Sequence, residues 1–206
     1  MALKIITEAE LTGKRVIARF DFNVPLKEGK ITDTTRIDLA LPTIKYILEQ
    51  KPSIFILMSH LGRPKGKVDS SFSLEPVATY LSEQLGEEII FTEAAVDAGI
   101  KELLTIGTTK VVLLENLRFH PEETKNDEEF AFKLSEYADV YVNDAFGAAH
   151  RKHASTHGIN RFFPGQSFCG ILLKTEIENL DIILNKPKKP FVGVIGGAKV
   201  ADKIKT

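Results

Sequence analysis

The chain has 206 residues, of which 43% are apolar and 27% charged, a globular balance that excludes a disordered chain or a fibre. Lysine and arginine number 27 against 28 aspartate and glutamate, so the net charge of −1 lacks the basic excess of a nucleic-acid-binding protein. No apolar stretch approaches the roughly 20 residues that span a bilayer, and early charges argue against an export signal. Cys169 is the single cysteine, so no internal disulfide can form, and we expect its side chain to be buried as a small apolar group. The lack of disulfides predicts a protein of a reducing, cytoplasmic compartment.

Short runs rich in aliphatic and β-branched residues predict buried strands. Amphipathic segments separate these runs along the chain. Alternation of continuous apolar strands with helices is typical of a parallel sheet covered on both faces, which is an α/β fold. The predicted strands are residues 15–21, 54–58, 88–91, 110–114, 139–143 and 191–195.

Three amphipathic segments predict helices against the sheet, because their apolar residues recur at steps of three and four. Pro42 falls inside the first segment, so it must occupy the first helical turn or kink the helix. Ser73 is expected to cap the second helix, and Asn126 with Glu129 resembles a capping box at the start of the third. The apolar positions of these helices span residues 37–48, 74–85 and 130–137.

The last quarter of the chain changes character. Residues 171–184 predict a long helix, the sequence KPKKP at 186–190 breaks it, and a new strand and helix start follow. One strand and part of a helix cannot bury a core. We therefore expect an N-terminal domain, a connecting helix, and the first strand–loop–helix of a second domain whose remainder is absent. The expected boundaries are 1–170, 171–187 and 188–206.

Polar residues gather in four segments that each follow a predicted strand, where parallel sheets bind their ligands. Arginine recurs in or near these loops, at Arg19, Arg36, Arg63, Arg118 and Arg151, and its planar guanidinium suits phosphate or carboxylate. For any one segment, turn residues, caps or surface ion pairs are the simpler explanation. Four arginine-bearing loops at four strand ends together favour a site for a small anion. The segments are 19–25, 59–64, 115–119 and 143–153.

Other side chains in these loops supply further candidates. Asp21 and Asn23 alternate outward beyond the first strand and offer an acceptor and an amide to a hydroxyl or carboxylate. Gly62 permits an unusual backbone angle, so that His60 and Arg63 can both face an anion.

Three further patterns in the sequence bear on other kinds of chemistry. His150, His153 and His157 could share a helical face, but no carboxylate or cysteine shares their spacing, so a metal site is not expected. Ser59 beside His60 is no evidence for a serine hydrolase, since no Gly-x-Ser-x-Gly elbow is present. Residues 193–199 (GVIGGAK) end a strand and open a helix that could cradle a phosphate, although they match neither the dinucleotide nor the Walker pattern.

Five motifs in this order resemble the phosphoglycerate kinase family: RFDFNVP, SHLGRP, ENLRF, NDAFGAAHRKHAS and GGAKVADKI. The resemblance runs from the first strand to the last residue. It implies two Rossmann-like three-layer αβα domains, the N-terminal one for a three-carbon acid and the C-terminal one for a nucleotide, joined by a long helix. The sequence differs slightly from the family's commonest motif at Ala148 and Lys152, and neither position is among the residues assigned to ligand binding.

The resemblance also implies a role for individual residues. Asp21 and Asn23 would hold the hydroxyl and carboxylate side of the acid, while His60 and the arginines of the later loops would bind its phosphate. Arg36 and Lys199 are the implied catalytic residues, next to the phosphoryl group in transfer. The implied substrate-binding set is Asp21, Phe22, Asn23, Arg36, His60, Leu61, Gly62, Arg63, Arg118 and Arg151. The implied nucleotide-binding set is Gly196, Gly197, Ala198, Lys199 and Lys203.

The activity so implied is reversible phosphoryl transfer between 1,3-bisphosphoglycerate and ADP, which gives 3-phosphoglycerate and ATP. Magnesium would be carried by ADP or ATP, with no protein metal ligand in this chain, and the full-length enzyme would be a monomer that needs neither nucleic acid nor membrane. The 206-residue chain alone is expected to be inactive because most of its nucleotide site is missing. The alternative is a non-catalytic module that binds a phosphorylated metabolite. A nicotinamide dehydrogenase is less favoured, since no dinucleotide fingerprint follows the first strand.

Overall fold

The computed structural model describes residues 3–105, 111–192 and 194, and the chain divides into two compact units, Met1–Thr175 and Glu176–Thr206. In the first unit the described residues form a six-stranded sheet in the order β5-β6-β4-β1-β7-β8, and every neighbouring pair is parallel. The strands are β1 Arg15–Arg19, β4 Ile54–Met58, β5 Ile90–Phe91, β6 Val111–Leu113, β7 Val140–Asn143 and β8 Ser167–Cys169.

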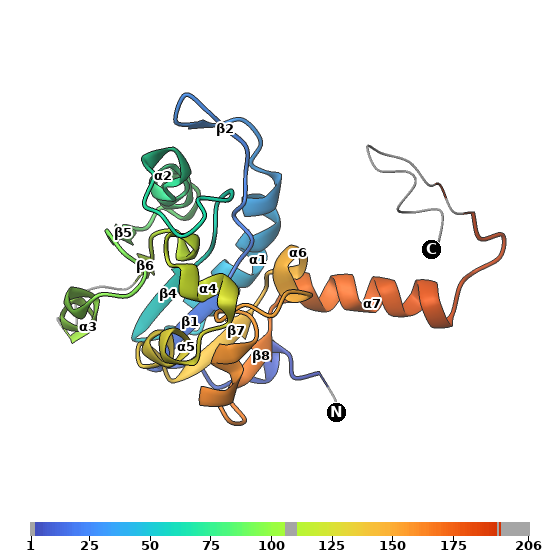
Figure 1. Ribbon diagram of the computed structural model, residues 1–206. Helices are drawn as coiled ribbons and strands as arrows, with labels where there is room; N and C mark the ends of the chain where they lie inside the picture. The colour runs from blue at the N-terminus through green and yellow to red at the C-terminus, as the bar shows by residue number, and fades with distance from the viewer. Residues whose placement is uncertain (1–2, 106–110, 193, 195–206) are drawn as a thin grey trace. The chain divides into compact units, whose positions relative to one another are not determined.

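Helices cover both faces of this sheet (Figure 1). Successive strand residues point to opposite faces, so Val16 and Ala18 of β1 join one core with α1 and α2, while Ile17 joins another with α3 and α5. Two apolar cores on either side of a parallel sheet confirm the α/β, three-layer αβα prediction. The helices are α1 Thr35–Glu49, α2 Glu75–Leu85, α3 Ala98–Thr105 and α5 Glu128–Ser135.

The strand order brings the loops of interest to one edge. β1 lies at the centre, with β4 on one side and β7 on the other, and β6 lies beside β4. Because all these strands are parallel, the segments that follow them leave at the same edge of the sheet. The connections diverge around β1, and such a point in an open sheet is where ligands bind.

Several predicted strand boundaries are wrong. β1 ends at Arg19 rather than at residue 21, and β5 keeps only two of the four residues predicted. The strand predicted at 191–195 is also wrong where the structure describes it, since Phe191, Val192 and Val194 have no strand structure and are exposed. A strand needs a neighbour for its backbone N–H and C=O groups, and no described strand pairs with this segment.

Short elements escaped the sequence analysis because their apolar residues are too few to show a period. They are the hairpin of β2 Leu26–Lys27 and β3 Lys30–Ile31, strand β8, helices α3, α4 Pro121–Lys125 and α6 Phe146–Ala149, and the 3-10 turns η1 Ile6–Glu8, η2 Ser70–Phe72, η3 Leu117–Phe119 and η4 Gly158–Phe162.

Two helix starts lie one residue from their predicted caps. Leu74 precedes α2, and its N–H donates to Glu115 at 2.9 Å, while Oγ of Ser73 accepts the N–H of Glu75 at 3.2 Å. Ser73 therefore bonds the start of the helix as predicted, together with a carboxylate from the β6 loop. At α5 the cap is Asp127, which accepts from the N–H of Phe130, because Asn126 ends α4 in the left-handed conformation. A tertiary contact therefore contributes to the start of α2, whereas a local side-chain cap begins α5.

Pro42 lies in the middle of α1, which excludes the first turn and leaves the kink as the remaining one of the two predicted alternatives. Cys169 is buried as predicted, and burial raises the pKa of its thiol to about 12. In the part of the chain that the structure describes, no helix has both the length and the apolar character that a membrane span requires.

The long helix predicted at 171–184 is confirmed as α7 Ile171–Asn185. Its first turn is fixed by side chains of the sheet edge and of α1. Oδ1 of Asp144 accepts the N–H of Leu173 at 2.9 Å, and Oγ1 of Thr43 accepts the N–H of Ile171 at 3.0 Å. Both bonds satisfy donors that a helix start leaves without intrahelical partners.

We predict opposite pH dependences for two aspartates. Burial raises the pKa of Asp144, so its native state favours the neutral acid, and Asp144→Asn should gain stability relative to the wild type as pH rises above ~4. The Arg15 guanidinium, 2.7 Å from Asp139, lowers the pKa of that carboxyl. Asp139→Asn should therefore lose stability over the same rise, by about 0.2–1 kcal/mol since the pair is half exposed.

Urea unfolding of the two variants and the wild type at pH 3.5, 5 and 7 measures both effects. Each variant serves as the control for the other, because both remove one carboxylate at the ends of β7. Slopes of the same sign for the two stability differences would contradict the prediction.

Candidate anion-binding site

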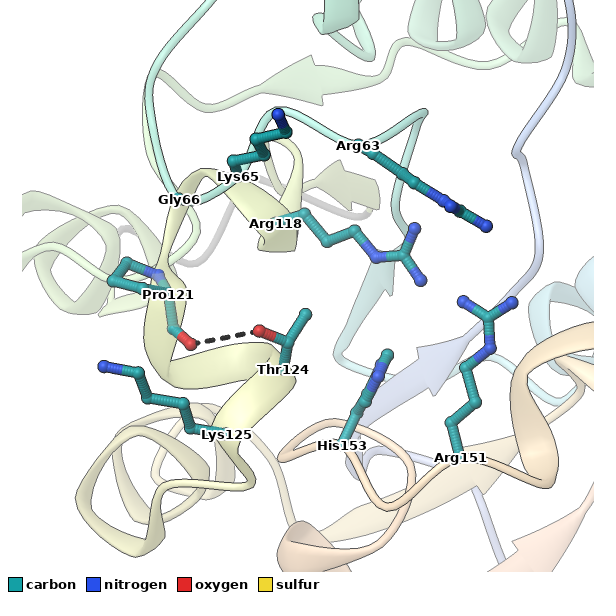
Figure 2. A pocket seen from close by; sticks show the side chains of 9 residues that line it. All are labelled: Arg63, Lys65, Gly66, Arg118, Pro121, Thr124, Lys125, Arg151 and His153. Carbon is teal, nitrogen blue, oxygen red and sulfur yellow. Dashed lines mark hydrogen bonds between the residues drawn. The ribbon is translucent and has the colours of Figure 1, made fainter.

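A cavity of about 410 Å³ lies among the segments that follow β4, β6 and β7. The lining is strongly basic, with five arginine or lysine side chains and no carboxylate among the residues that the structure describes around it. In Figure 2 the guanidinium ends of Arg63, Arg118 and Arg151 turn toward the same space from three different segments. The lining residues are Arg63, Lys65, Gly66, Arg118, Pro121, Thr124, Lys125, Arg151 and His153.

Arg118 is the most constrained of these cations. Its Nη1 donates to the carbonyl of Gly62 at 2.7 Å, and its Nε is buried without a hydrogen-bond partner in the described structure. Burial, and then repulsion from Arg151 and Arg19, lowers the pKa of Arg118 to about 10. A guanidinium held beside like charges with an unused donor is an arrangement that a bound anion would stabilise.

The sequence around Arg118 explains its position. Asn116 accepts the N–H of Arg118 at 3.0 Å, which begins the turn η3 directly after β6. The Asn116 amide also donates to the carbonyls of Leu61 and Phe72, each at 2.8 Å. One buried asparagine therefore joins the loop after β6 to the loop that carries His60 and Arg63.

Gly62 shapes the loop after β4. It adopts a φ of +60°, and a Cβ at this position would lie 2.3 Å from the Phe72 ring. Its N–H donates to Oδ1 of Asn23 at 2.8 Å, so the first loop and the second are also joined. Because Oδ1 of Asn23 is used in this bond, its amide NH₂ remains as the donor.

Asp21 and Arg36 form an ion pair at the same edge of the sheet. Arg36 lies in the first turn of α1, and 51% of its side chain is exposed, whereas Asp21 is largely covered. Gly147 of α6 packs against Asp21 so closely that a Cβ there would overlap the carboxylate. Neither residue lines the cavity, so this ion pair is separate from Arg63, Arg118 and Arg151, which are the members of the predicted set that do.

Phe22 and Leu61 are buried core residues. The Phe22 ring stacks on Phe20 with centroids 5.3 Å apart, and Leu61 joins the core on the α1 face. Their side chains therefore stabilise the fold, and a ligand could reach only their backbone.

His60 lies beside a buried arginine rather than in the cavity lining. Arg19 is fully buried and donates to Nδ1 of His60 at 3.0 Å and to Oγ of Ser155 at 2.9 Å, so it is no free anion ligand. Burial, and then the charges of Arg19, Arg118 and Arg151, lowers the pKa of His60 well below its usual range. His60 is therefore neutral at physiological pH.

The sequence analysis missed part of the lining and the buried groups around it. Lys65 and Lys125 extend the basic surface beyond the arginines. His153 also lines the cavity, and burial together with nearby arginines lowers its pKa to about 4. The available signal was position, since each of these residues lies within seven residues of a candidate arginine.

The nucleotide residues Gly196, Gly197, Ala198, Lys199 and Lys203 lie outside the described residues. Within residues 3–105, 111–192 and 194, no group of three or more histidine, cysteine, aspartate or glutamate side chains is arranged to hold a metal ion.

Comparisons with known proteins agree with this geometry. The family model described as phosphoglycerate kinase matches residues 6–206. The phosphoglycerate kinases of Pelotomaculum thermopropionicum and Moorella thermoacetica are 49% and 52% identical over 205 residues, which is 99% of this chain and 51% of each relative. The chain therefore belongs to the phosphoglycerate kinase family, and it spans about half the length of these curated relatives.

Solved structures show the same relationship. Phosphoglycerate kinase from Coxiella burnetii superposes with a TM-score of 0.83 at 41% identity, covering 98% of this chain and 50% of that one. The enzyme from Pyrococcus horikoshii OT3 gives a TM-score of 0.88 at 32% identity, with 98% and 51% coverage.

We predict that Gly62→Ala is more damaging than Gly86→Ala. Both glycines have a positive φ, +60° and +65°, so alanine should cost about 1–2 kcal/mol at either position. Only at Gly62 would the new Cβ also overlap Phe72, which should add about 1–3 kcal/mol, while nothing lies within 4 Å at Gly86. Urea unfolding of the two variants measures the difference, and equal losses would contradict the prediction.

Proposed function

We propose that this chain is the acid-substrate half of a phosphoglycerate kinase, which transfers a phosphoryl group reversibly between 1,3-bisphosphoglycerate and ADP to give 3-phosphoglycerate and ATP. The observation that carries the proposal is the basic cavity, in which three arginines converge and Arg118 retains a buried, unused Nε–H. Membership of the family, on which the residue roles rest, supports the same substrate class.

The three-carbon acid offers a phosphate at one end and a carboxylate and hydroxyl at the other. Arg63, Arg118 and Arg151 would bind the phosphate by charge-assisted hydrogen bonds, which are strongest when planar guanidinium meets planar or tetrahedral oxyanion. The NH₂ of Asn23 suits the carboxylate as a donor, since its oxygen is already engaged by Gly62. The Asp21 carboxylate, which can only accept, suits the hydroxyl.

Arg36 has the features of a group that acts on the phosphoryl in transfer. Its guanidinium is half exposed and held by the Asp21 carboxylate on the first turn of α1. Phosphoryl transfer needs no covalent enzyme intermediate, only positioning and neutralisation of charge on the moving oxygens. A preorganised guanidinium supplies that neutralisation without reorganising during the reaction.

The nucleotide half of the reaction depends on residues beyond those described. Lys199 and Lys203, with the backbone of Gly196, Gly197 and Ala198, would contact the nucleotide phosphates as the family resemblance implies. Magnesium enters with ADP or ATP and neutralises phosphate charge. Because the phosphoryl donor and acceptor would lie on different domains, closure of the two domains must bring them together. We therefore expect this chain alone to bind the acid without turning it over.

We predict that 3-phosphoglycerate binds this chain at or below millimolar concentration. Affinity should fall as salt rises, because charge attraction is screened over ~10 Å at 0.1 M. Arg118→Ala should weaken binding at least tenfold, since hydrogen bonds to charged groups contribute about 1.5–3 kcal/mol. Titration calorimetry in 20 and 200 mM salt measures both effects.

Arg161→Ala is the matched control for this titration. Arg161 is also an arginine, but it is exposed and pairs with Glu128 at 2.7 Å outside the cavity lining. Its loss should leave affinity unchanged. Absence of heat with the wild-type chain at millimolar ligand would refute the proposed site.

In a full-length enzyme that contains this chain, we predict different kinetic signatures for two arginines. Arg36→Ala should lower kcat far more than it raises KM for the acid, by about 2.7–4 kcal/mol in transition-state stabilisation. Arg118→Ala should raise KM first, because its contact exists already in the ground state. Steady-state kinetics in both variants test this, and changes in KM alone for both would show that the roles are misassigned.

A further inference from the structure

Four buried polar side chains form one continuous hydrogen-bonded chain next to the cavity. Glu123 of α4 accepts from Ser155 twice, from the hydroxyl at 2.6 Å and from the backbone N–H at 2.9 Å. The Ser155 oxygen accepts from Nε of Arg19 at 2.9 Å, and Nη2 of Arg19 donates to Nδ1 of His60 at 3.0 Å. Glu123, Ser155 and Arg19 are fully buried, and His60 is 4% exposed.

The direction of every bond in this relay, Glu123–Ser155–Arg19–His60, follows from the donors available. A guanidinium has only donors, so the Nδ1 of His60 must accept and the ring proton must be on Nε2. The Ser155 hydroxyl has one proton, and since Nε of Arg19 is already a donor toward it, that proton goes to Glu123. The carboxylate accepts both Ser155 donors and neutralises the buried arginine.

His60 has an alternative tautomer, with the proton on Nδ1, that a neighbouring carboxylate could accept from. Oδ1 of Asp21 lies 4.0 Å from the same Nδ1. If Arg19 withdrew its donor, Nδ1 could instead carry the proton and donate to Asp21, and Nε2 would then present a lone pair. A lone pair repels a phosphate oxygen, whereas an Nε2–H attracts it, so the two tautomers have opposite effects on an anionic ligand.

We propose that Glu123 and Ser155 are positioning residues for the anion site, because they hold Arg19 in the orientation that fixes His60 as the neutral Nε2–H tautomer. In this state His60 offers one N–H donor to the ligand, and Nε2 has no hydrogen-bond partner among the described residues. Only this last step, donation to the phosphorylated acid, rests on the proposed function.

The groups that face His60 from each neighbouring element agree with a neutral ring. Arg19 from β1, Arg118 from the β6 loop, and Arg151 and His153 from the β7 loop all oppose a positive charge there, and burial acts in the same direction on its pKa. Asp21 is the one acidic neighbour in the described structure close enough to favour the imidazolium or the Nδ1–H form. The relay therefore prevents a hydrogen bond from Nδ1 of His60 to Asp21, because Nδ1 already accepts from Arg19.

Long-range ¹H–¹⁵N spectra of the chain labelled with ¹⁵N-histidine report the tautomer directly, with the His60 signals assigned from a His60→Gln spectrum. We expect unprotonated Nδ1 and protonated Nε2 from pH 5 to 8. Ser155→Ala removes the bridging hydroxyl. In Glu123→Gln the amide NH₂ replaces one of the two oxygens that accept from Ser155. In one orientation the NH₂ faces the backbone N–H of Ser155, so two donors oppose each other. In the other orientation the NH₂ faces the Ser155 hydroxyl, which already receives the Arg19 donor and then has no acceptor for its own proton.

Both variants should shift His60 toward the Nδ1–H form and weaken binding of 3-phosphoglycerate by roughly tenfold. Glu122→Gln is the matched control, because it removes one carboxylate from the same helix without touching the relay. Ser155→Thr keeps the hydroxyl and should retain the wild-type tautomer. A purely structural role would change stability in the variants without changing the tautomer of the folded protein.

A wild-type spectrum with Nδ1 protonated at pH 7 overturns the inference whether or not any variant folds. An unchanged tautomer in a folded Ser155→Ala or Glu123→Gln protein overturns it as well, and since the two variants break the same link from opposite sides, one folded variant is enough. If the tautomer shifts as expected but the wild-type chain binds no 3-phosphoglycerate, the relay stands and the proposed function fails.

Discussion

The anion site depends on one buried charge, the guanidinium of Arg19 at the carboxyl end of the central strand β1. A fully buried arginine is stable only with its donors satisfied and a counter-charge nearby. Its hydrogen bonds reach the carbonyl of Phe20, the ring of His60 and the hydroxyl of Ser155, which lie in the segments after β1, β4 and β7. Satisfying the donors of Arg19 therefore joins the segment after β1 to two of the three segments that line the cavity, those after β4 and β7.

Positive charges outnumber negative charges around the cavity. Glu123 neutralises Arg19 inside the protein, and Asp21 pairs with Arg36, but Arg118 retains an unused buried Nε–H and a pKa lowered to about 10. Excess positive charge destabilises the unliganded fold and is relieved when an anion binds. Burial, and then the same repulsion, lowers the pKa of His60 and keeps it neutral, so the site combines fixed cations with one neutral donor rather than a uniform basic surface.

Sequence reasoning predicted the sheet and located the loops, because continuous apolar strands and polar strand ends both leave a local pattern. It could not separate Arg19 from Arg63, since both are arginines near a strand end and only the packing makes one a buried structural group. Glu122 and Glu123 are adjacent in sequence, yet only Glu123 is fully buried. The strand predicted at 191–195 shows the converse error at Phe191, Val192 and Val194, the residues of this range that the structure describes, because no described strand pairs with them.

The start of α7 is tied to the same buried arginine. The N–H of Leu173 donates to Asp144, and the N–H of Asp144 donates to the carbonyl of Arg19 at 2.8 Å. Gly170 permits this approach, since a Cβ there would lie 2.3 Å from the Asp144 carboxylate. Losing a buried hydrogen bond costs about 1–3 kcal/mol, so the first turn of α7 and the end of β1 favour moving together. One path of hydrogen bonds therefore runs from the first turn of α7 through Asp144 and Arg19 to His60.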